Sequence, residues 1–102
     1  MKKLINIRSC AGEFAENKDV AKRLRIEVIM PALSRGDEVV LDFKDVSGVT
    51  QSFIHALISD PLREFKDRAF DNLMYQHAGT EVKEIISIVY RYMQESFDGE
   101  SS

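Results

Sequence analysis

The sequence contains one cysteine, Cys10, two prolines and no tryptophan. A single cysteine cannot form a disulfide within the chain, which fits a reducing compartment, so we expect a cytoplasmic protein. A lone cysteine near the end of a strand is more typical of a small core residue than of a nucleophile. No stretch approaches the ~18 apolar residues of a transmembrane helix, and the start of the chain lacks the apolar segment of a signal peptide.

An excess of positive charge is also missing, since the formal net charge is −3. Sequence-independent binding of nucleic acids depends on lysine and arginine side chains that neutralise phosphates. The composition therefore argues against a nucleic-acid partner. Lys22, Arg23 and Arg25 form a local basic cluster, which the neighbouring Glu27 makes more typical of a solvated helix face.

Motifs of catalysis and cofactor binding are absent from the sequence. There is no G-x-G-x-x-G, no Walker-type G-x-x-x-x-G-K, no H-E-x-x-H and no C-x-x-C. The two histidines, His55 and His77, are far apart in the sequence, and the carboxylates are scattered along charged faces. We therefore expect no enzyme activity, no catalytic residue, no metal site and no cofactor.

The length and composition indicate one small globular domain. The chain has 102 residues, of which 44% are hydrophobic and 30% are charged, which is ordinary for a folded domain. We expect the domain to cover residues 1–97 and a flexible polar tail to cover residues 98–102.

The periodicity of apolar residues predicts an α/β fold of three strands that alternate with three helices. The strands are expected at residues 3–9, 38–43 and 72–78, and the helices at residues 19–30, 53–65 and 81–95. The segment between residues 11 and 19 reads as a loop. Strands separated by helices pair in parallel through right-handed crossovers, so we expect the order β-α-β-α-β-α and a mostly parallel sheet.

Several residues predict where these elements begin, bend and end. Asn17 or Asp19 caps the first helix, and Pro31 ends or kinks it. Pro61 either bends the second helix or begins a new turn. The segment 38–43 is almost continuously apolar, as expected for a central strand covered on both faces. Asp42 interrupts it, and its carboxylate must find donors or remain in water.

A small polar segment, residues 45–52, separates this strand from the second helix. In open α/β sheets, ligands and partners bind beyond the carboxyl ends of the strands. Thr50 or Ser52 has two alternative roles there. Its hydroxyl is a helix cap, or it lies where the helix N-terminus favours an anion and a phosphoryl group.

The stretch VVLDFKDVSGVTQSFIHAL resembles the STAS superfamily, the sulfate transporter and anti-sigma factor antagonist domains. It resembles more closely the STAS-like family of unknown function, typified by V-x-L-D-F-x-x-V-x-x-V-T-Q-S-F. The matching positions are Val40, Asp42, Phe43, Val46, Val49, Thr50, Gln51, Ser52 and Phe53.

The resemblance implies a small mixed sheet with helices packed mainly on one side. It also implies a regulatory role, typical of bacterial anti-sigma factor antagonists, through protein–protein contacts and without catalysis. In typical STAS regulators a helix begins with D-S-S-G, and a kinase of the GHKL ATPase type phosphorylates the second serine. Aligned from Val46, Thr50 stands at the aspartate, Ser52 at the phosphorylated serine and Phe53 at the glycine.

The leading hypothesis is a regulatory module that binds a protein partner, such as an ATPase or kinase. Its candidate residues, by this resemblance, are Asp45, Ser47, Thr50, Gln51 and Ser52, with Ser52 as the possible phosphorylation site. The alternatives are a module that binds a small molecule or nucleotide, and a homodimer with a structural role. The sequence does not decide between monomer and homodimer.

Overall fold

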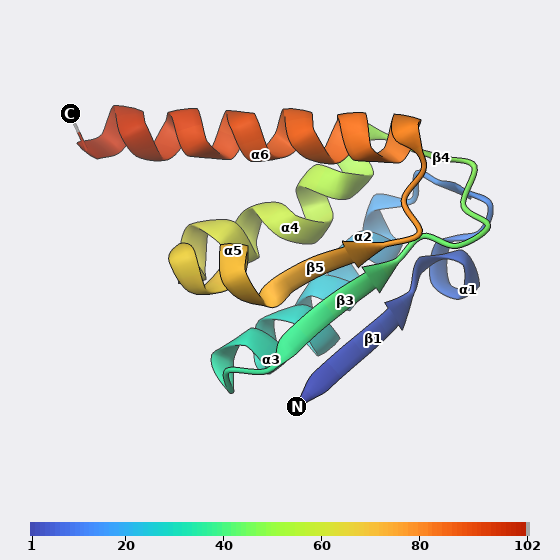
Figure 1. Cartoon of the computed structure of the whole chain (residues 1–102), viewed down its shortest axis with the longest axis horizontal. Helices are drawn as coiled ribbons and strands as arrows, with labels where there is room; N and C mark the ends of the chain where they lie inside the picture. The colour runs from blue at the N-terminus through green and yellow to red at the C-terminus, as the bar shows by residue number, and fades with distance from the viewer. Residues whose placement is uncertain (102) are drawn as a thin grey trace.

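A parallel sheet of three strands organises the molecule. In this computed structural model the backbone is described for residues 1–101 and the side chains for residues 1–95. The strands lie in the order β1-β3-β5, and in Figure 1 the helices lie behind and above the sheet while its front face carries none. The strands are β1 (Lys2–Asn6), β3 (Glu38–Asp42) and β5 (Leu73–Gln76).

The helical segments connect the strands as the sequence predicts, so the α/β fold, the parallel pairing and the one-sided packing are confirmed. The helices are α1 (Ile7–Ala11), α2 (Lys18–Leu24), the π-helical turn η1 (Arg25–Ile29), α3 (Met30–Ser34), α4 (Gln51–Phe65), α5 (Asp67–Asn72) and α6 (Thr80–Ser101). The tail expected at residues 98–102 falls where no side chain is described, and Ser102 lies outside the described residues, so that expectation stays a prediction.

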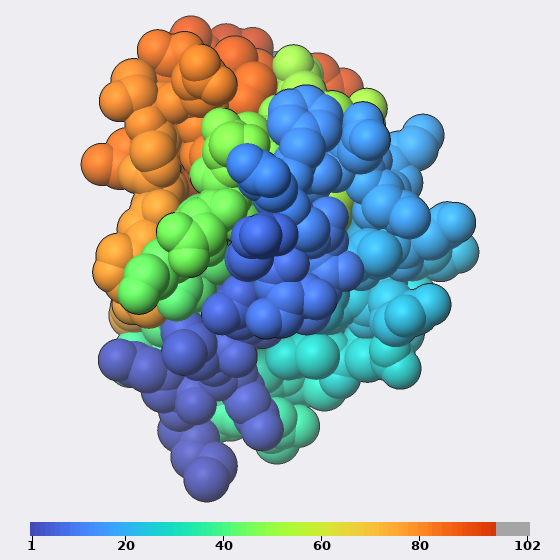
Figure 2. Space-filling view, turned by 90° about the vertical axis from the view of Figure 1, so that its right-hand side faces the viewer, coloured from blue at the N-terminus to red at the C-terminus, as the bar shows by residue number. Residues whose placement is uncertain are grey.

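The segment after β1 differs from its prediction. The strand ends at Asn6, whose side chain accepts a hydrogen bond of 3.0 Å from the backbone N–H of Ser9 and so caps α1. Gly12, with a φ of 85°, closes this short helix. Cys10 is exposed on α1, so the expectation of a core cysteine is wrong. In Figure 2 this segment, in blue, lies beside the green loop that follows β3.

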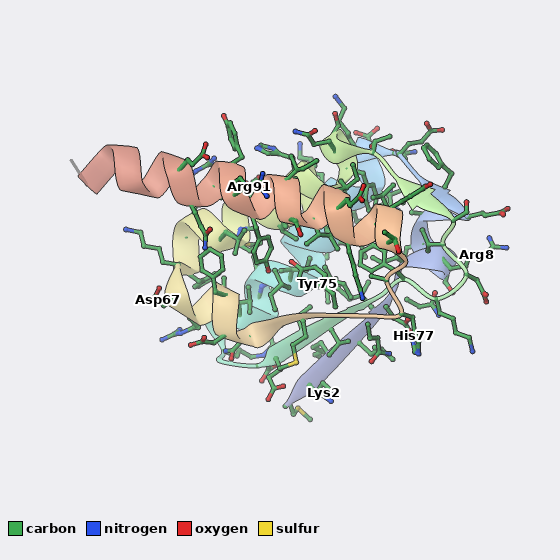
Figure 3. All side chains as sticks on the ribbon, turned by 45° about the horizontal axis from the view of Figure 1, so that its top comes forward. Lys2, Arg8, Asp67, Tyr75, His77 and Arg91 are labelled. Carbon is green, nitrogen blue, oxygen red and sulfur yellow. The ribbon has the colours of Figure 1, made fainter. Side chains whose placement is uncertain are left out.

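The register of the sheet separates a helix-covered face from an open face. Val39 and Leu41 are completely buried on the helix-covered side. On the open face Leu4, Val40 and Met74 form one row across the three strands. Val40 is only 4% exposed because it lies between its two neighbours, whereas Leu4 at the edge is 60% exposed. Figure 3 labels Lys2 at the start of β1 and His77 just beyond β5.

Pro31 does not end the first helix. The chain stays helical through α2, η1 and α3, from Lys18 to Ser34, and Asn17 caps its start as predicted. In the π-helical turn the backbone N–H of Met30 donates to the carbonyl of Arg25, five residues earlier. This turn shifts the hydrogen-bond register directly before the proline, which occupies the first turn of α3, where its missing N–H costs little.

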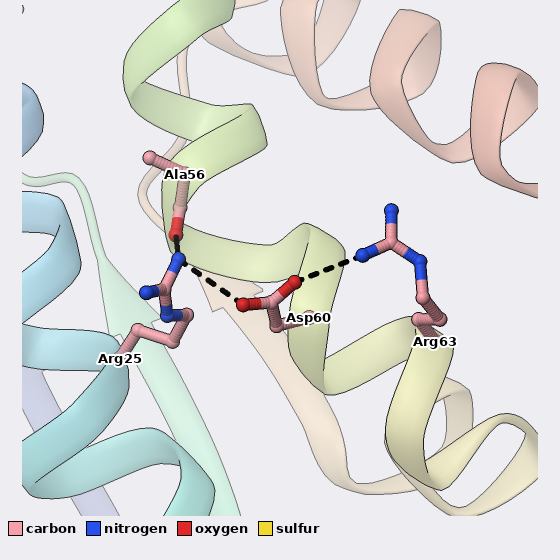
Figure 4. Close-up of polar contacts among 4 residues, drawn as sticks. All are labelled: Arg25, Ala56, Asp60 and Arg63. Atoms are coloured by element: carbon pink, nitrogen blue, oxygen red, sulfur yellow. Dashed lines mark hydrogen bonds and ion pairs between the residues drawn. The ribbon is translucent and has the colours of Figure 1, made fainter.

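Pro61 likewise lies inside α4, which continues to Phe65. The helix is clamped at this point by Arg25, whose Nη1 donates to the carbonyl of Ala56 at 3.2 Å and lies 3.3 Å from Oδ2 of Asp60 (Figure 4). Arg63 reaches Oδ1 of the same carboxylate at 3.0 Å. The cluster therefore joins η1 to α4 where the proline removes a helical donor.

We predict that Arg25→Met lowers the free energy of unfolding by about 1–3 kcal/mol, because it removes charge-assisted hydrogen bonds from a site where the arginine side chain is only 18% exposed. Arg63→Met is the matched control, since Arg63 pairs with the same Asp60 but is 57% exposed. We expect the control to cost less than about 0.5 kcal/mol. Urea denaturation measures the free energy of unfolding of both variants. Equal losses of this free energy would contradict a stabilising role specific to Arg25.

Candidate functional site

The candidate site lies at the carboxyl end of the parallel sheet, where the segments that follow β1, β3 and β5 meet. Figure 2 looks onto this end and shows the loop after β3 between the N-terminal segment and the start of α6. Two short strands, β2 (Phe14–Ala15) and β4 (Gly48–Val49), pair there in parallel. The loop that carries the candidate residues is therefore attached to the segment that follows β1.

Backbone hydrogen bonds hold this loop in place. The N–H of Ser47 donates to the carbonyl of Glu13 at 2.8 Å, and the N–H of Thr50 donates to that of Ala15 at 3.0 Å. A Cβ at Gly48 would lie 3.0 Å from a ring carbon of Phe14, so glycine permits the close contact of β4 with β2. The loop is consequently a fixed surface rather than a free connector.

Thr50 is the cap of α4, as one of the two alternatives predicts. Its side-chain oxygen accepts a hydrogen bond of 3.1 Å from the backbone N–H of Phe53. Phe53 is completely buried. Gln51 and Ser52 occupy the first two positions of the helix and are exposed. The hydroxyl of Ser52 is thus at the helix start without acting as its cap.

The structure places four of the five sequence candidates in two surface hollows. Asp45 and Ser47 line one of about 440 Å³. Gln51 and Ser52 line another of about 480 Å³, together with Lys18, His55 and Ala56. Thr50 lines neither hollow, since its side chain is engaged in the cap.

The two hollows differ in charge. The hollow at Ser52 combines the Lys18 ammonium group with the N-terminus of α4, and both favour an anion. The hollow at Asp45 contains the side chains of Arg8 and Glu13, which have opposite charges. Lys18 belongs to α2 and was not among the sequence candidates, because only the tertiary structure brings it to α4.

A buried carboxylate at the end of β3 forms a second polar feature. Asp42 is 8% exposed, and its Oδ1 lies 3.0 Å from Nδ1 of His77 and 3.0 Å from the backbone N of Lys44. The hydrogen bonds from His77 and then from Lys44 lower the pKa of Asp42, against the opposing effect of burial. The expectation that this carboxylate finds donors is confirmed. Sequence reasoning missed His77 as the donor, although the parallel register places Asp42 beside Gln76.

Within residues 1–95, whose side chains are described, no group of three or more histidine, cysteine, aspartate or glutamate residues could hold a metal ion. Among the helices that the structure describes, none is both long and apolar enough to cross a membrane.

Comparison with known protein families shows a match over most of the sheet and α4. A family model described as a STAS-like domain of unknown function matches residues 20–87, which include β3, the loop, α4 and β5. No curated protein and no solved structure showed a significant match.

We predict that Asp42→Asn reduces the loss of stability in acid. Because the folded state lowers the pKa of Asp42 below its ordinary value of 3.8, its carboxylate stabilises the fold above about pH 4, and this contribution is lost as the pH falls through the lowered value. Between about pH 5 and about pH 2, the free energy of unfolding should therefore fall further for wild type than for Asp42→Asn. Chemical denaturation across this range measures the difference, and parallel curves would contradict it.

We also predict that Thr50→Ala and Ser52→Ala have different effects on stability. Loss of the cap hydrogen bond in Thr50→Ala should cost about 1 kcal/mol. Ser52→Ala should change the free energy of unfolding by less than about 0.5 kcal/mol, because the exposed hydroxyl does not cap the helix. Thermal and urea denaturation of both variants test this, and a larger loss for Ser52→Ala would reverse the assignment of the cap.

Proposed function

The chain belongs to the family of STAS-like domains of unknown function, and from this we propose that it is a non-catalytic regulatory module that binds a protein partner. Its contact surface is the loop from Asp45 to Ser52 with the first turns of α4. The observation that carries the proposal is the exposed Ser52 hydroxyl, which lies next to the capping Thr50. A partner or a kinase can reach this hydroxyl without disturbing the helix cap.

Phe53, at the position where related regulators have glycine, is compatible with a partner-binding surface at the start of α4. Its side chain is 0% exposed because it points into the core. A buried phenylalanine leaves the outer side of the helix start as open as a glycine would. The larger side chain is therefore compatible with close approach of a partner to Gln51 and Ser52.

The surroundings of Ser52 suit a phosphorylation switch. A phosphoryl group adds about −1.5 to −2 charges at neutral pH. Lys18 lines the same hollow, and the N-terminus of α4 favours negative charge. Phosphorylation would therefore be accommodated by the fold and would act on the partner's binding. We propose an ATPase of the GHKL type as the partner and kinase.

We predict that Ser52→Asp weakens binding of the partner at least about tenfold relative to wild type. The reason is that a nucleotide-bearing partner presents phosphates, which a carboxylate at this position repels. Ser52→Ala should bind as wild type does but accept no phosphate. The measurement is quantitative mass spectrometry of proteins captured from native cells on each variant, with phosphosite mapping in the same samples.

The matched control is Ser34→Asp, which adds the same charge at an exposed serine at the end of α3. It should capture the partner as wild type does. Identical capture by wild type, Ser52→Ala and Ser52→Asp would contradict the switch. If Ser34→Asp and Ser52→Asp lose equal amounts of captured partner, the cause is the added net charge and not its position at Ser52.

A further inference from the structure

A groove of about 430 Å³ lies between the end of β5 and α6 and has no part in the proposed function. Its lining residues are Tyr75, His77, Ala78, Lys83, Ile86 and Ser87. None of them lines the hollow at Ser52. The volume falls in the range of about 300–1,000 Å³ that is usual for small-molecule sites. The groove also lies at the carboxyl end of a parallel strand, where open α/β sheets bind ligands.

Tyr75, the aromatic residue of the groove's apolar wall, is held by several contacts. The hydroxyl of Tyr75 lies 2.7 Å from that of Tyr90 on α6, so each tyrosine has its polar end engaged by the other. Phe70 contacts Tyr90 edge-on with 5.3 Å between ring centroids, and Phe43 stacks on Tyr75 at 6.4 Å. Burial raises the pKa of Tyr75 well above its ordinary value, so this phenol stays neutral. In Figure 3, the side chain of Tyr75 extends from β5 toward α6.

His77 provides a fixed polar group at the end of the strand. Its φ of 55° lies in the left-handed region, which histidine adopts more often than most residues other than glycine. The buried Asp42 accepts the hydrogen bond of Nδ1 at 3.0 Å. The other ring nitrogen, Nε2, is left to accept from a ligand hydroxyl when the ring is neutral, or to donate to an anion when it is protonated.

The charge of the groove favours an anionic group. Of the six described residues that line it, Lys83 is a cation and none is acidic. Lys83 and Ser87 also line an adjoining hollow of about 380 Å³ along α6, in which Arg91 accompanies Glu84. The first turn of α6 begins at Thr80, so the positive end of a long helix is also close to this region.

We propose that this groove binds a small organic anion. A phosphate or carboxylate group of the ligand contacts Lys83 and, when the imidazole is protonated, Nε2 of His77. The apolar body of the ligand lies against Tyr75, Ala78 and Ile86. Three features agree on this ligand: an apolar wall that includes Tyr75, a histidine whose Nδ1 is bonded to Asp42, and a lysine with no acidic residue among the groove's lining. The proposal does not depend on Ser52 or on a protein partner.

Amide chemical shifts measured by NMR during titration with simple probes test the proposal. Phenyl phosphate and benzoate carry the anion and the ring, inorganic phosphate carries the anion alone, and phenol carries the ring alone. We expect at least one of the first two to shift the amides of residues 77–87 with a dissociation constant on the order of 1 mM or tighter, and the last two to bind at least about tenfold more weakly. Comparison of phenyl phosphate with benzoate identifies the preferred anion.

Lys83→Gln tests the assignment of the charge, because it replaces an exposed side chain on α6 and preserves a good helix former. It should weaken binding of the preferred probe about fivefold to tenfold, whereas Lys22→Gln on the distant α2 should leave it unchanged. His77→Asn, which tolerates the left-handed conformation, should also weaken it. The proposal is overturned if neither anionic probe binds, if phenol or inorganic phosphate binds equally well, or if Lys83→Gln and Lys22→Gln behave alike.

Discussion

The parallel register of the sheet places Asn6, Asp42 and Gln76 in one row at its carboxyl end, and the geometry of the candidate site depends on this row. Each of these residues forms a hydrogen bond with a segment that follows its own strand or the neighbouring strand. Asn6 caps α1, and Asp42 holds the backbone of Lys44 and the ring of His77. The carbonyl of Gln76 accepts the backbone N–H of Phe43 at 3.0 Å. Because the three connections begin from one bonded row, the row fixes where they start relative to each other.

The sequence predicts the parts of the fold that rest on long local patterns. The β-branched run of β3 and the apolar stripes of the first helix, α4 and α6 are such patterns, and they give the element order and the parallel sheet. Five-residue α1 is too short for periodicity, although Asn6 before it and Gly12 after it are recognisable cap signals. The passage of the first helix through Pro31 depends on a π-helical turn that no local propensity specifies.

The candidate site is predictable to a similar degree. The sequence limits the cap of α4 to Thr50 or Ser52, and the structure assigns it to Thr50. The polar segment after a buried strand identifies the loop. The groupings within the site require tertiary structure, since Lys18 on α2 lines the same hollow as Ser52 and His77, just after β5, contacts Asp42. The sequence thus identifies the loop, whereas Lys18 and His77 are found only from the tertiary structure.

The short helix α1 also affects whether the sheet edge of one molecule can pair with that of another. β1 is an edge strand, and exposed edges of sheets are templates on which other chains add strands. Here the edge begins with Lys2 and Lys3 and turns into α1 directly after Asn6, so the pairing surface is both charged and brief. At the opposite edge the left-handed His77 ends β5 in the same abrupt manner. Both edge strands of the described sheet are therefore short, which limits the surface on which another chain could add a strand.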